Sequence, residues 1–251
     1  MRDNNFIIEN NAKHLWHPMG APGDSINKPP KVITNANGSQ ISDIDGHTTV
    51  DAVGGLWCVN LGYSNEAVKK AISEQLNLLP YYSGFAGTTN PPAIEASFMV
   101  KEMFKADGME KVFFTSGGSD SVETCLRLSR QYHRLRGEPT RTKFISLKKG
   151  YHGTHFGGAS VNGNNRFRIA YEPLLPGCFH LPSPYTYRNP FNETDSQKLA
   201  LNIAQAFEDE ISFQDKNTIA AFIMEPIQGA GGVIVPVSYT HLRAHETPEH
   251  R

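Results

Sequence analysis

The chain has 251 residues, 39% of them apolar, and a formal net charge of −1, which is ordinary for a globular protein of one large domain or two small ones. The balanced charge gives no sign of a nucleic-acid or membrane surface, and three cysteines without CxxC spacing argue against a disulfide framework or a zinc site. The apolar run Phe6–Ile8 is too short for a signal peptide, so a cytoplasmic location is expected.

The N-terminal part is expected to be loop-rich and polar over residues 1–40 and to form a hairpin next. The segment Ile41–Asp45 alternates and then turns at Asp45-Gly46. A helix is predicted over Ser64–Leu79, with Ser64 as its cap. A second helix is predicted to open at Asn90-Pro91 and to end before Gly108.

The most informative stretch is Val112–Thr124. An apolar run predicted as a strand, Val112–Phe114, leads to the turn Gly117-Gly118-Ser119, which we call the phosphate cup. A helix pattern follows at once, with its stripe at Val122, Cys125, Leu126, Ser129, Tyr132 and His133. Because the first N–H groups of a helix lack partners and lie at the positive end of its dipole, this arrangement favours an anion, although an ordinary turn is the alternative.

Two acidic residues and the known fingerprints limit this interpretation. Asp120 and Glu123 suit the start of a helix, but both must face away from a bound phosphate. The dinucleotide fingerprint and the P-loop pattern are both absent from the sequence, which makes a nucleotide-binding domain a distant option.

The second half alternates strands and helices. Predicted strands cover Phe144–Leu147 and Ile219–Met224, the latter buried on both faces, and a helix covers Asp195–Ile211. A Gly-rich turn lies at Gly150–Thr154, and residues 157–195 read as a long surface excursion. This order implies a parallel sheet, whose ligands bind at the carboxyl ends of the strands. The phosphate cup, the Gly-rich turn and Glu225-Pro226 are all expected at that edge.

Three residues at this edge are candidate ligand contacts. Tyr151 could stack on a planar ligand or be an ordinary half-buried tyrosine. His152 could be a polar contact or a satisfied histidine. Glu225 ends an apolar strand and needs a partner, which could be a ligand ring, a carboxylic acid or backbone amides.

Other residues invite weaker hypotheses. Trp57 and Phe85 stand beside glycines. The ordinary interpretation is that both side chains pack in the core, and the more specific one is that they line a ligand pocket. A metal site is not expected, because the spaced histidine pairs lack a metal-binding context; these pairs are His152 with His155 and His241 with His245.

Taken together, several segments in this order resemble the class III aminotransferases, the pyridoxal-phosphate enzymes often called ω-transaminases or amine–pyruvate transaminases. The resemblance covers about residues 6–236. Its segments are Leu15–Met19, Asp43–Gly46, Gly55–Tyr63, Thr88–Pro92, the phosphate cup, Lys149–Thr154 and Glu225–Gly232. It implies an α/β fold of type I, in which an N-terminal α+β segment precedes part of the parallel-sheet large domain.

The resemblance also implies roles for particular residues. Gly118 and Ser119 would bind the cofactor phosphate, Tyr151 would stack on the pyridine ring, and His152 would lie nearby. Glu225 would hold the aspartate that pairs with the ring nitrogen. The sequence departs from many relatives at Gly117, where they carry serine, so a backbone group would replace one side-chain contact there.

The substrate side and the quaternary structure follow from the same resemblance. Trp57 would line the substrate pocket, and residues around Phe85 would reach a neighbouring subunit's site in a homodimer. An amine or ω-amino acid would donate the amino group, and an oxo acid such as pyruvate would accept it.

The family's catalytic lysine and ring-nitrogen aspartate follow the Glu-Pro segment, whereas the last lysine here is Lys216. No catalytic residue is therefore assigned, and the chain as written is expected to be inactive. We expect residues 1–62 to belong to the small domain, 63–236 to form a partial cofactor-binding large domain, and 237–251 to be a non-native tail. The alternative is a non-catalytic fragment that binds phosphate or cofactor, or a pseudo-enzyme partner of a full-length relative.

Overall fold

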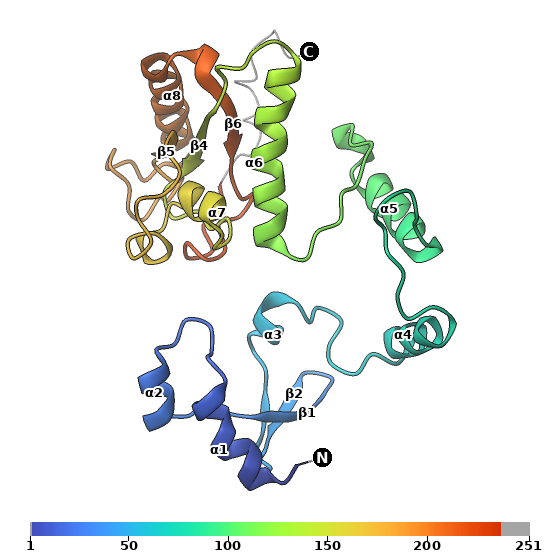
Figure 1. Cartoon of the computed structure of the whole chain (residues 1–251). Coiled ribbons are helices and arrows are strands. Elements are labelled where there is room, and N and C mark those ends of the chain that lie inside the picture. Colours follow the sequence, from blue (N-terminus) through green and yellow to red (C-terminus); the bar gives the residue numbers. More distant parts are fainter. Residues whose placement is uncertain (1, 237–251) are drawn as a thin grey trace. The chain divides into compact units, whose positions relative to one another are not determined.

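The computed structural model describes residues 2–236, so the tail predicted to be non-native, residues 237–251, lies outside the described residues. The chain divides into two compact units, one ending at Glu110 and the other beginning at Lys111 (Figure 1). The expected domain boundary after residue 62 concerns the complete family fold and stays a prediction.

The first unit combines a small antiparallel sheet with short helices. Its elements are α1 (Asn4–His14), α2 (Pro22–Asn27), β1 (Ile33–Asn37), β2 (Gln40–Asp43), β3 (Thr48–Val50), α3 (Gly54–Trp57), α4 (Glu66–Leu78), α5 (Pro91–Met103) and the 3₁₀ turn η1 (Lys105–Asp107). The sheet order is β1-β2-β3, and the β2–β3 hairpin confirms the turn predicted at Asp45-Gly46. The loop-rich interpretation of residues 1–40 was wrong, because two helices and a strand lie there.

The helix starts of this unit follow capping chemistry. Helix α5 begins at Pro91 as predicted, and Asn90 caps it, since its side chain accepts the N–H of Ala93 at 3.1 Å. Ser64 does not cap α4. Asn65 does, through the N–H of Val68 at 3.2 Å, while the Ser64 hydroxyl donates to the Ala36 carbonyl at 2.8 Å. Helix α5 ends at Met103, and Gly108 instead closes the following 3₁₀ turn with a left-handed backbone, φ 68°.

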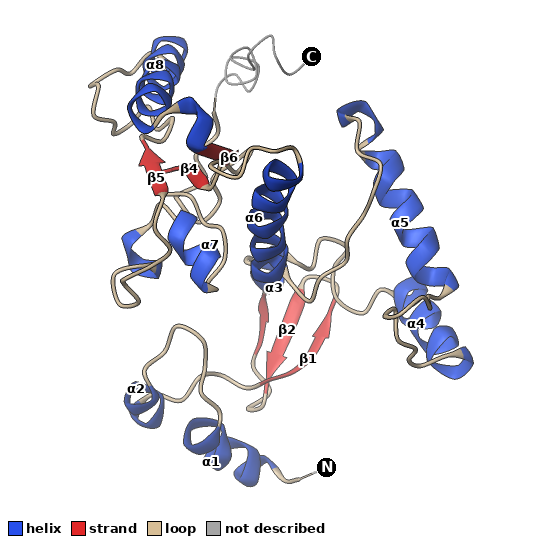
Figure 2. Cartoon of the chain, turned by 45° about the horizontal axis from the view of Figure 1, so that its top comes forward, coloured by secondary structure: helices blue, strands red, loops and turns tan. Residues whose placement is uncertain are grey.

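The second unit is the predicted α/β layer structure (Figure 2). Its elements are α6 (Gly118–Leu135), β4 (Lys143–Leu147), α7 (Phe156–Val161), η2 (Asn165–Phe167), β5 (Cys178–Leu181), α8 (Ser196–Gln214), η3 (Lys216–Thr218) and β6 (Ile219–Ile223). The strands lie in the order β5-β4-β6, and both pairings are parallel. The predicted parallel sheet is therefore confirmed.

The core lies on both faces of the central strand β4. Phe144 packs with Leu126 of α6 and Val161 of α7 on one face. Ile145 and Leu147 pack on the other face with Leu181, and α8 covers them through residues such as Phe207. Since side chains alternate along a strand, a strand with helices on both faces is mostly apolar, as Phe144, Ile145 and Leu147 of β4 show.

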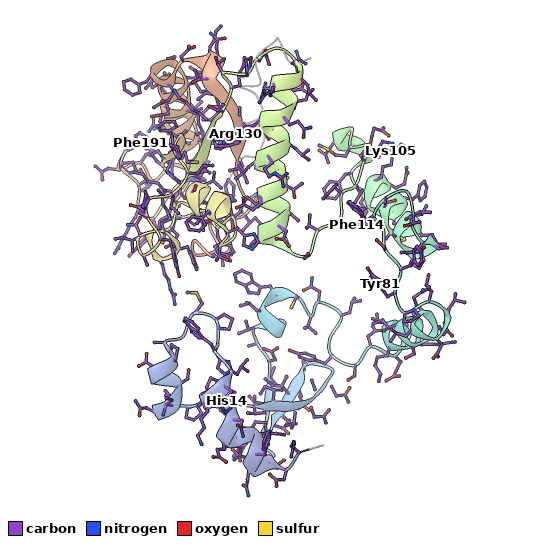
Figure 3. All side chains as sticks on the ribbon, in the orientation of Figure 1. His14, Tyr81, Lys105, Phe114, Arg130 and Phe191 are labelled. Carbon is purple, nitrogen blue, oxygen red and sulfur yellow. The ribbon has the colours of Figure 1, made fainter. Side chains whose placement is uncertain are left out.

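Three sequence-based expectations about this unit were wrong. Residues 112–114 form no strand, because no described strand pairs with them; Phe114 is 55% exposed in the segment before α6 (Figure 3). Residues 157–195 contain the buried helix α7 and strand β5 instead of a surface excursion. Strand β6 is half-buried along its length, because it is the edge strand of the described sheet.

The buried stripe of α6 is narrower than predicted. Leu126 is buried and Val122 and His133 are partly buried, whereas Cys125 and Tyr132 are exposed. The imidazole of His133 is bonded to the Ala220 carbonyl at 2.9 Å, which fixes the helix against β6. Within residues 2–236, no helix has both the length and the apolar character that a membrane crossing needs. The cytoplasmic location stays a prediction.

Candidate functional site

The phosphate cup is the uncapped start of an 18-residue helix, α6. No side chain caps the helix at Gly117, and the first turn therefore presents backbone N–H groups to solvent. Gly117 and Gly118 are exposed, and a Cβ at either would meet no atom within 4 Å. The cup is therefore open and suited to an anion, as the sequence predicts.

Ser119 connects the cup to the Gly-rich turn, residues 150–154. Its hydroxyl oxygen accepts the N–H of Thr154 at 3.2 Å. Because this bond uses an oxygen lone pair, the hydroxyl proton is left to donate to an anion. Gly153 is held close by, since a Cβ there would stand 2.7 Å from Ser119 Oγ.

The two acidic residues of the first turn both have partners across the site. Asp120 lies next to His155, with 3.4 Å between Oδ1 and Nδ1. Glu123 accepts the N–H of Gly158 at 2.9 Å, at the start of α7. Both carboxylates therefore have partners other than a bound anion, which is the arrangement that the sequence analysis required of them.

Tyr151 and Glu225 meet where β4 and β6 end. The Tyr151 N–H donates to Glu225 Oε2 at 2.9 Å, and the Tyr151 ring lies 4.8 Å from the ring of Phe167. The ring remains 36% exposed and so is available to a planar ligand. Burial raises the pKa of Glu225, while the N–H groups of Tyr151 and Gly229 oppose that shift. Of the partners considered for Glu225, backbone amides are those observed.

His152 is buried with one ring nitrogen unused. Its Nε2 has no hydrogen-bond partner among the described residues, and the residue is only 6% exposed. Burial lowers the pKa of His152 to about 4, so the imidazole is neutral near pH 7. A buried polar atom without a partner suits a site that is completed by a ligand.

Two residues that no sequence pattern indicated, Gln228 and Asn162, hold this region together. Gln228 is 1% exposed, accepts the Ser183 hydroxyl at 2.6 Å and donates to the Lys148 carbonyl at 3.0 Å, which fixes the loop after Glu225 to the ends of β4 and β5. Asn162, at the end of α7, bonds to the 150–154 turn. The partners of both residues are distant in sequence, so no local pattern indicates these contacts.

Trp57 and Phe85 lie in the first unit. Trp57 is 62% exposed with a left-handed backbone, φ 68°, and Phe85 is 84% exposed, so core packing does not hold for either in this structure. Asp43, Asp45 and His47 place their ligand atoms within 4.8 Å of one another, a grouping that sequence analysis did not consider. Asp43 already accepts the N–H groups of Asp45 and His47, and these contacts explain the cluster as a turn.

Comparison with known proteins decides the family. The family model described as aminotransferase class-III matches residues 23–245. The chain belongs to the class III aminotransferases. The putrescine–pyruvate aminotransferase of Pseudomonas aeruginosa is 37% identical over 206 residues, which are 82% of this chain and 45% of that protein. The mitochondrial gamma-aminobutyrate transaminase 1 of Oryza sativa subsp. indica is 36% identical over 219 residues, 87% of this chain and 42% of that protein.

Solved structures give the same fold. An amine transaminase from an uncultivated Pseudomonas species, in its PLP-bound form, matches with a TM-score of 0.89 and 45% identity over 92% of this chain and 52% of its own. An (S)-enantioselective ω-transaminase from Thermomicrobium roseum matches with a TM-score of 0.92 and 31% identity, over 97% and 55% of the two chains. The fold-type-I assignment is confirmed. The chain spans about half the length of the curated relatives it matches.

The buried histidines of this aminotransferase chain predict acid sensitivity. Burial lowers the pKa of His152 and of His180 to about 4, from 6.5, with Arg168 adding to the shift at His180. A lowered pKa in the folded state means that stability is complete above pH 6.5 and is lost as pH falls toward 4. At about 1.4 kcal/mol per pKa unit the two shifts together would correspond to about 6 kcal/mol by pH 4, and solvent screening at the partly exposed His180 reduces the loss of unfolding free energy that we expect to roughly 2–4 kcal/mol.

Urea unfolding of the 251-residue chain at several pH values measures this loss. The double variant His152→Leu, His180→Leu should show a flatter dependence between pH 6.5 and 4. An equal slope in the variant and the wild type would assign the acid sensitivity to other groups.

Proposed function

We propose that this chain forms the cofactor-binding part of a pyridoxal-phosphate-dependent aminotransferase. The reaction proposed for the whole protein transfers an amino group between an amine or ω-amino acid and an oxo acid such as pyruvate. The family membership supports the reaction class. The printed names of relatives, which include putrescine–pyruvate and gamma-aminobutyrate transaminases, support this substrate class.

The observation that carries the proposal is the meeting of three separate segments at one edge of the sheet. Ser119 bonds to Thr154, and Tyr151 bonds to Glu225, so the phosphate cup, the 150–154 turn and the end of β6 are joined by two hydrogen bonds. Ligands of open parallel sheets bind at this edge. A helix N-terminus, an exposed aromatic ring and a carboxylate are the groups expected around a phosphorylated pyridine.

The residues of the chain would act mainly by holding and orienting. Gly118 and Ser119 would hold the phosphate through backbone N–H groups and the hydroxyl proton. The Tyr151 ring would stack on the pyridine ring, with the neutral imidazole of His152 nearby, and Glu225 would orient the group that pairs with the ring nitrogen. When bound, pyridoxal phosphate supplies an aldehyde that accepts an amino group and a ring that takes up electron density.

The substrate side of the proposal rests on the first unit. Trp57 would line the substrate pocket, and residues around Phe85 would reach the site of a second subunit in a homodimer. Both aromatic side chains are exposed within their unit, as such roles require. One solved ω-transaminase, 32% identical, is a tryptophan-to-glycine variant engineered for asymmetric synthesis of bulky amines.

Borohydride trapping tests the proposal with the 251-residue chain. Pyridoxal 5′-phosphate should bind through the cup and the turn. Reduction should not attach it to any one lysine in a one-to-one ratio, because no lysine follows Lys216. Dialysis after reduction should therefore remove most of the cofactor, and an amine with pyruvate should not be converted. Peptide mass mapping and absorbance measure the two results.

The possible outcomes separate the parts of the proposal. Absence of saturable cofactor binding would contradict the cofactor site. Stoichiometric labelling of one lysine, or turnover of an amine with pyruvate, would contradict the assignment of no catalytic lysine to this chain.

The second candidate function, a non-catalytic fragment that holds phosphate or cofactor, is favoured by the open cup and predicts the same reversible binding. The pseudo-enzyme alternative predicts that the chain co-elutes with a full-length relative.

A further inference from the structure

The side chain of Asn162 is hydrogen-bonded to the backbone of the 150–154 turn. Its side-chain Oδ1 accepts the N–H of His152, and its Nδ2 donates to the carbonyl of Gly153 at 2.8 Å. One amide group thus satisfies two consecutive residues of the turn. Because one partner is a donor and the other an acceptor, the two bonds also define which end of the amide is oxygen.

The support for this amide is rigid. Asn162 is 0% exposed and ends helix α7, where its N–H donates to the Gly158 carbonyl at 3.0 Å. Its own carbonyl accepts from Arg168 Nη1 at 3.1 Å. A residue held by backbone bonds on both sides and by complete burial has little freedom to move its side chain.

The turn that Asn162 holds carries the groups of the proposed cofactor site. Tyr151, whose ring is offered to the ligand, directly precedes His152, and its N–H reaches Glu225. Thr154, which follows Gly153, reaches Ser119 of the phosphate cup. The two bonds of Asn162 therefore lie between the ring contact and the phosphate contact.

Loss of the Asn162 amide would leave two polar groups unpaired in a closed environment. His152 and Gly153 are both buried, so water cannot replace the amide at its site without a rearrangement of the turn. The Tyr151 ring stands one residue away and would lose its fixed direction. The backbone N–H groups of the cup belong to the first turn of α6, and only the Ser119 hydroxyl is bonded to the turn, through Thr154.

We propose that Asn162 is a positioning residue that sets the 150–154 turn for binding the cofactor ring. The proposal rests on the proposed cofactor site. The proposal distinguishes two contributions to binding. Asn162 determines the affinity for a ring attached to phosphate, whereas the phosphate cup binds an anion without help from Asn162.

Calorimetric titration of the 251-residue chain with two probes tests this. The first probe, 4′-deoxypyridoxine 5′-phosphate, has the ring and the phosphate but no aldehyde, so surface lysines cannot capture it. The second probe is inorganic phosphate. We expect Asn162→Ala to weaken the ring phosphate at least about tenfold, as loss of a buried hydrogen-bond pair would, and to change phosphate affinity less than about twofold.

Two further variants sharpen the comparison. Asn162→Asp has nearly the same shape and keeps the acceptor for the His152 N–H, but cannot donate to Gly153 when ionised, so a loss between wild type and alanine is expected. Asn77→Ala is the matched control: it makes the same exchange at an exposed position of α4 in the first unit, and both affinities should match the wild type.

Each result decides the question. Unchanged ring-phosphate affinity in both Asn162 variants would overturn the proposal. An equal loss for both probes, or variants whose circular dichroism shows that they do not fold, would make the role of Asn162 merely structural and overturn it as well. If the wild type binds the ring phosphate no better than inorganic phosphate, the proposed cofactor site fails instead, which is a different result.

Discussion

Ser119→Leu should weaken binding of pyridoxal 5′-phosphate by the 251-residue chain about a hundredfold. The serine hydroxyl is the side-chain donor of the phosphate cup, because its oxygen is engaged by Thr154 while its proton remains available. A hydrogen bond to a charged group contributes about 1.5–3 kcal/mol, and the bulk of leucine beside Gly153 adds a steric loss. Fluorescence titration with the cofactor measures the change.

Two other variants show how much of this loss comes from the hydroxyl group and how much from the bulk of leucine at this position. Ser119→Ala removes the hydroxyl without adding bulk, and it should cost about tenfold in affinity. Ser73→Leu, an exposed serine on α4, repeats the same exchange away from the cup and should leave affinity unchanged. Wild-type affinity in Ser119→Leu, with a native circular dichroism spectrum, would show that the cofactor phosphate does not bind at the start of α6.

Gly158→Ala should lower the free energy of unfolding by about 2–3 kcal/mol. A Cβ at Gly158 would stand 2.6 Å from the His152 carbonyl oxygen and 3.3 Å from Gly153, both backbone atoms of the 150–154 turn. Backbone atoms cannot move aside without breaking hydrogen bonds of the turn, so the added methyl group must push the turn and helix α7 apart. Urea unfolding followed by circular dichroism measures the loss, and binding of the ring phosphate should weaken with it.

Gly157→Ala is the natural control for that measurement. Its Cβ would approach only the carboxylate of Glu123, at 2.7 Å, and that side chain can move away at the expense of its bond to the Gly158 N–H. The higher helix propensity of alanine offsets part of that cost, so a loss of about 1 kcal/mol is expected, smaller than that of Gly158→Ala. Similar losses in both variants would show that the close approach of Gly158 to the turn does not govern stability.

The elements predicted best from sequence are those with strong local signals. Helix α8 begins after Asp195, which caps it through the N–H of Lys198 at 2.9 Å, and its apolar residues have helical spacing. Strand β4 is a short, mostly apolar run, and such runs indicate a strand covered on both faces. The parallel sheet followed from the alternation of these elements, and the meeting of Ser119, the 150–154 turn and Glu225 followed from the sheet.

The errors came from signals that only tertiary contacts resolve. Helix α7 contains Gly157 and Gly158, which indicate a loop locally, yet here small residues let the helix approach the 150–154 turn closely. Strand β5 lies within a segment rich in glycine, proline and asparagine, and it forms because β4 offers it a paired edge. Residues 112–114 show the reverse, since an apolar run without a paired neighbour stays irregular.

The sequence by itself determined the family, the α/β order and the identity of the candidate cofactor residues, because ordered motifs and periodic apolar patterns are local properties of a chain. The tertiary structure decided how those residues are held: Ser119 by Thr154, Glu225 by the Tyr151 N–H, and the turn between them by Asn162. These bonds join residues up to 74 positions apart. Their partners are selected by packing of the sheet and α7 in space, which no local pattern encodes.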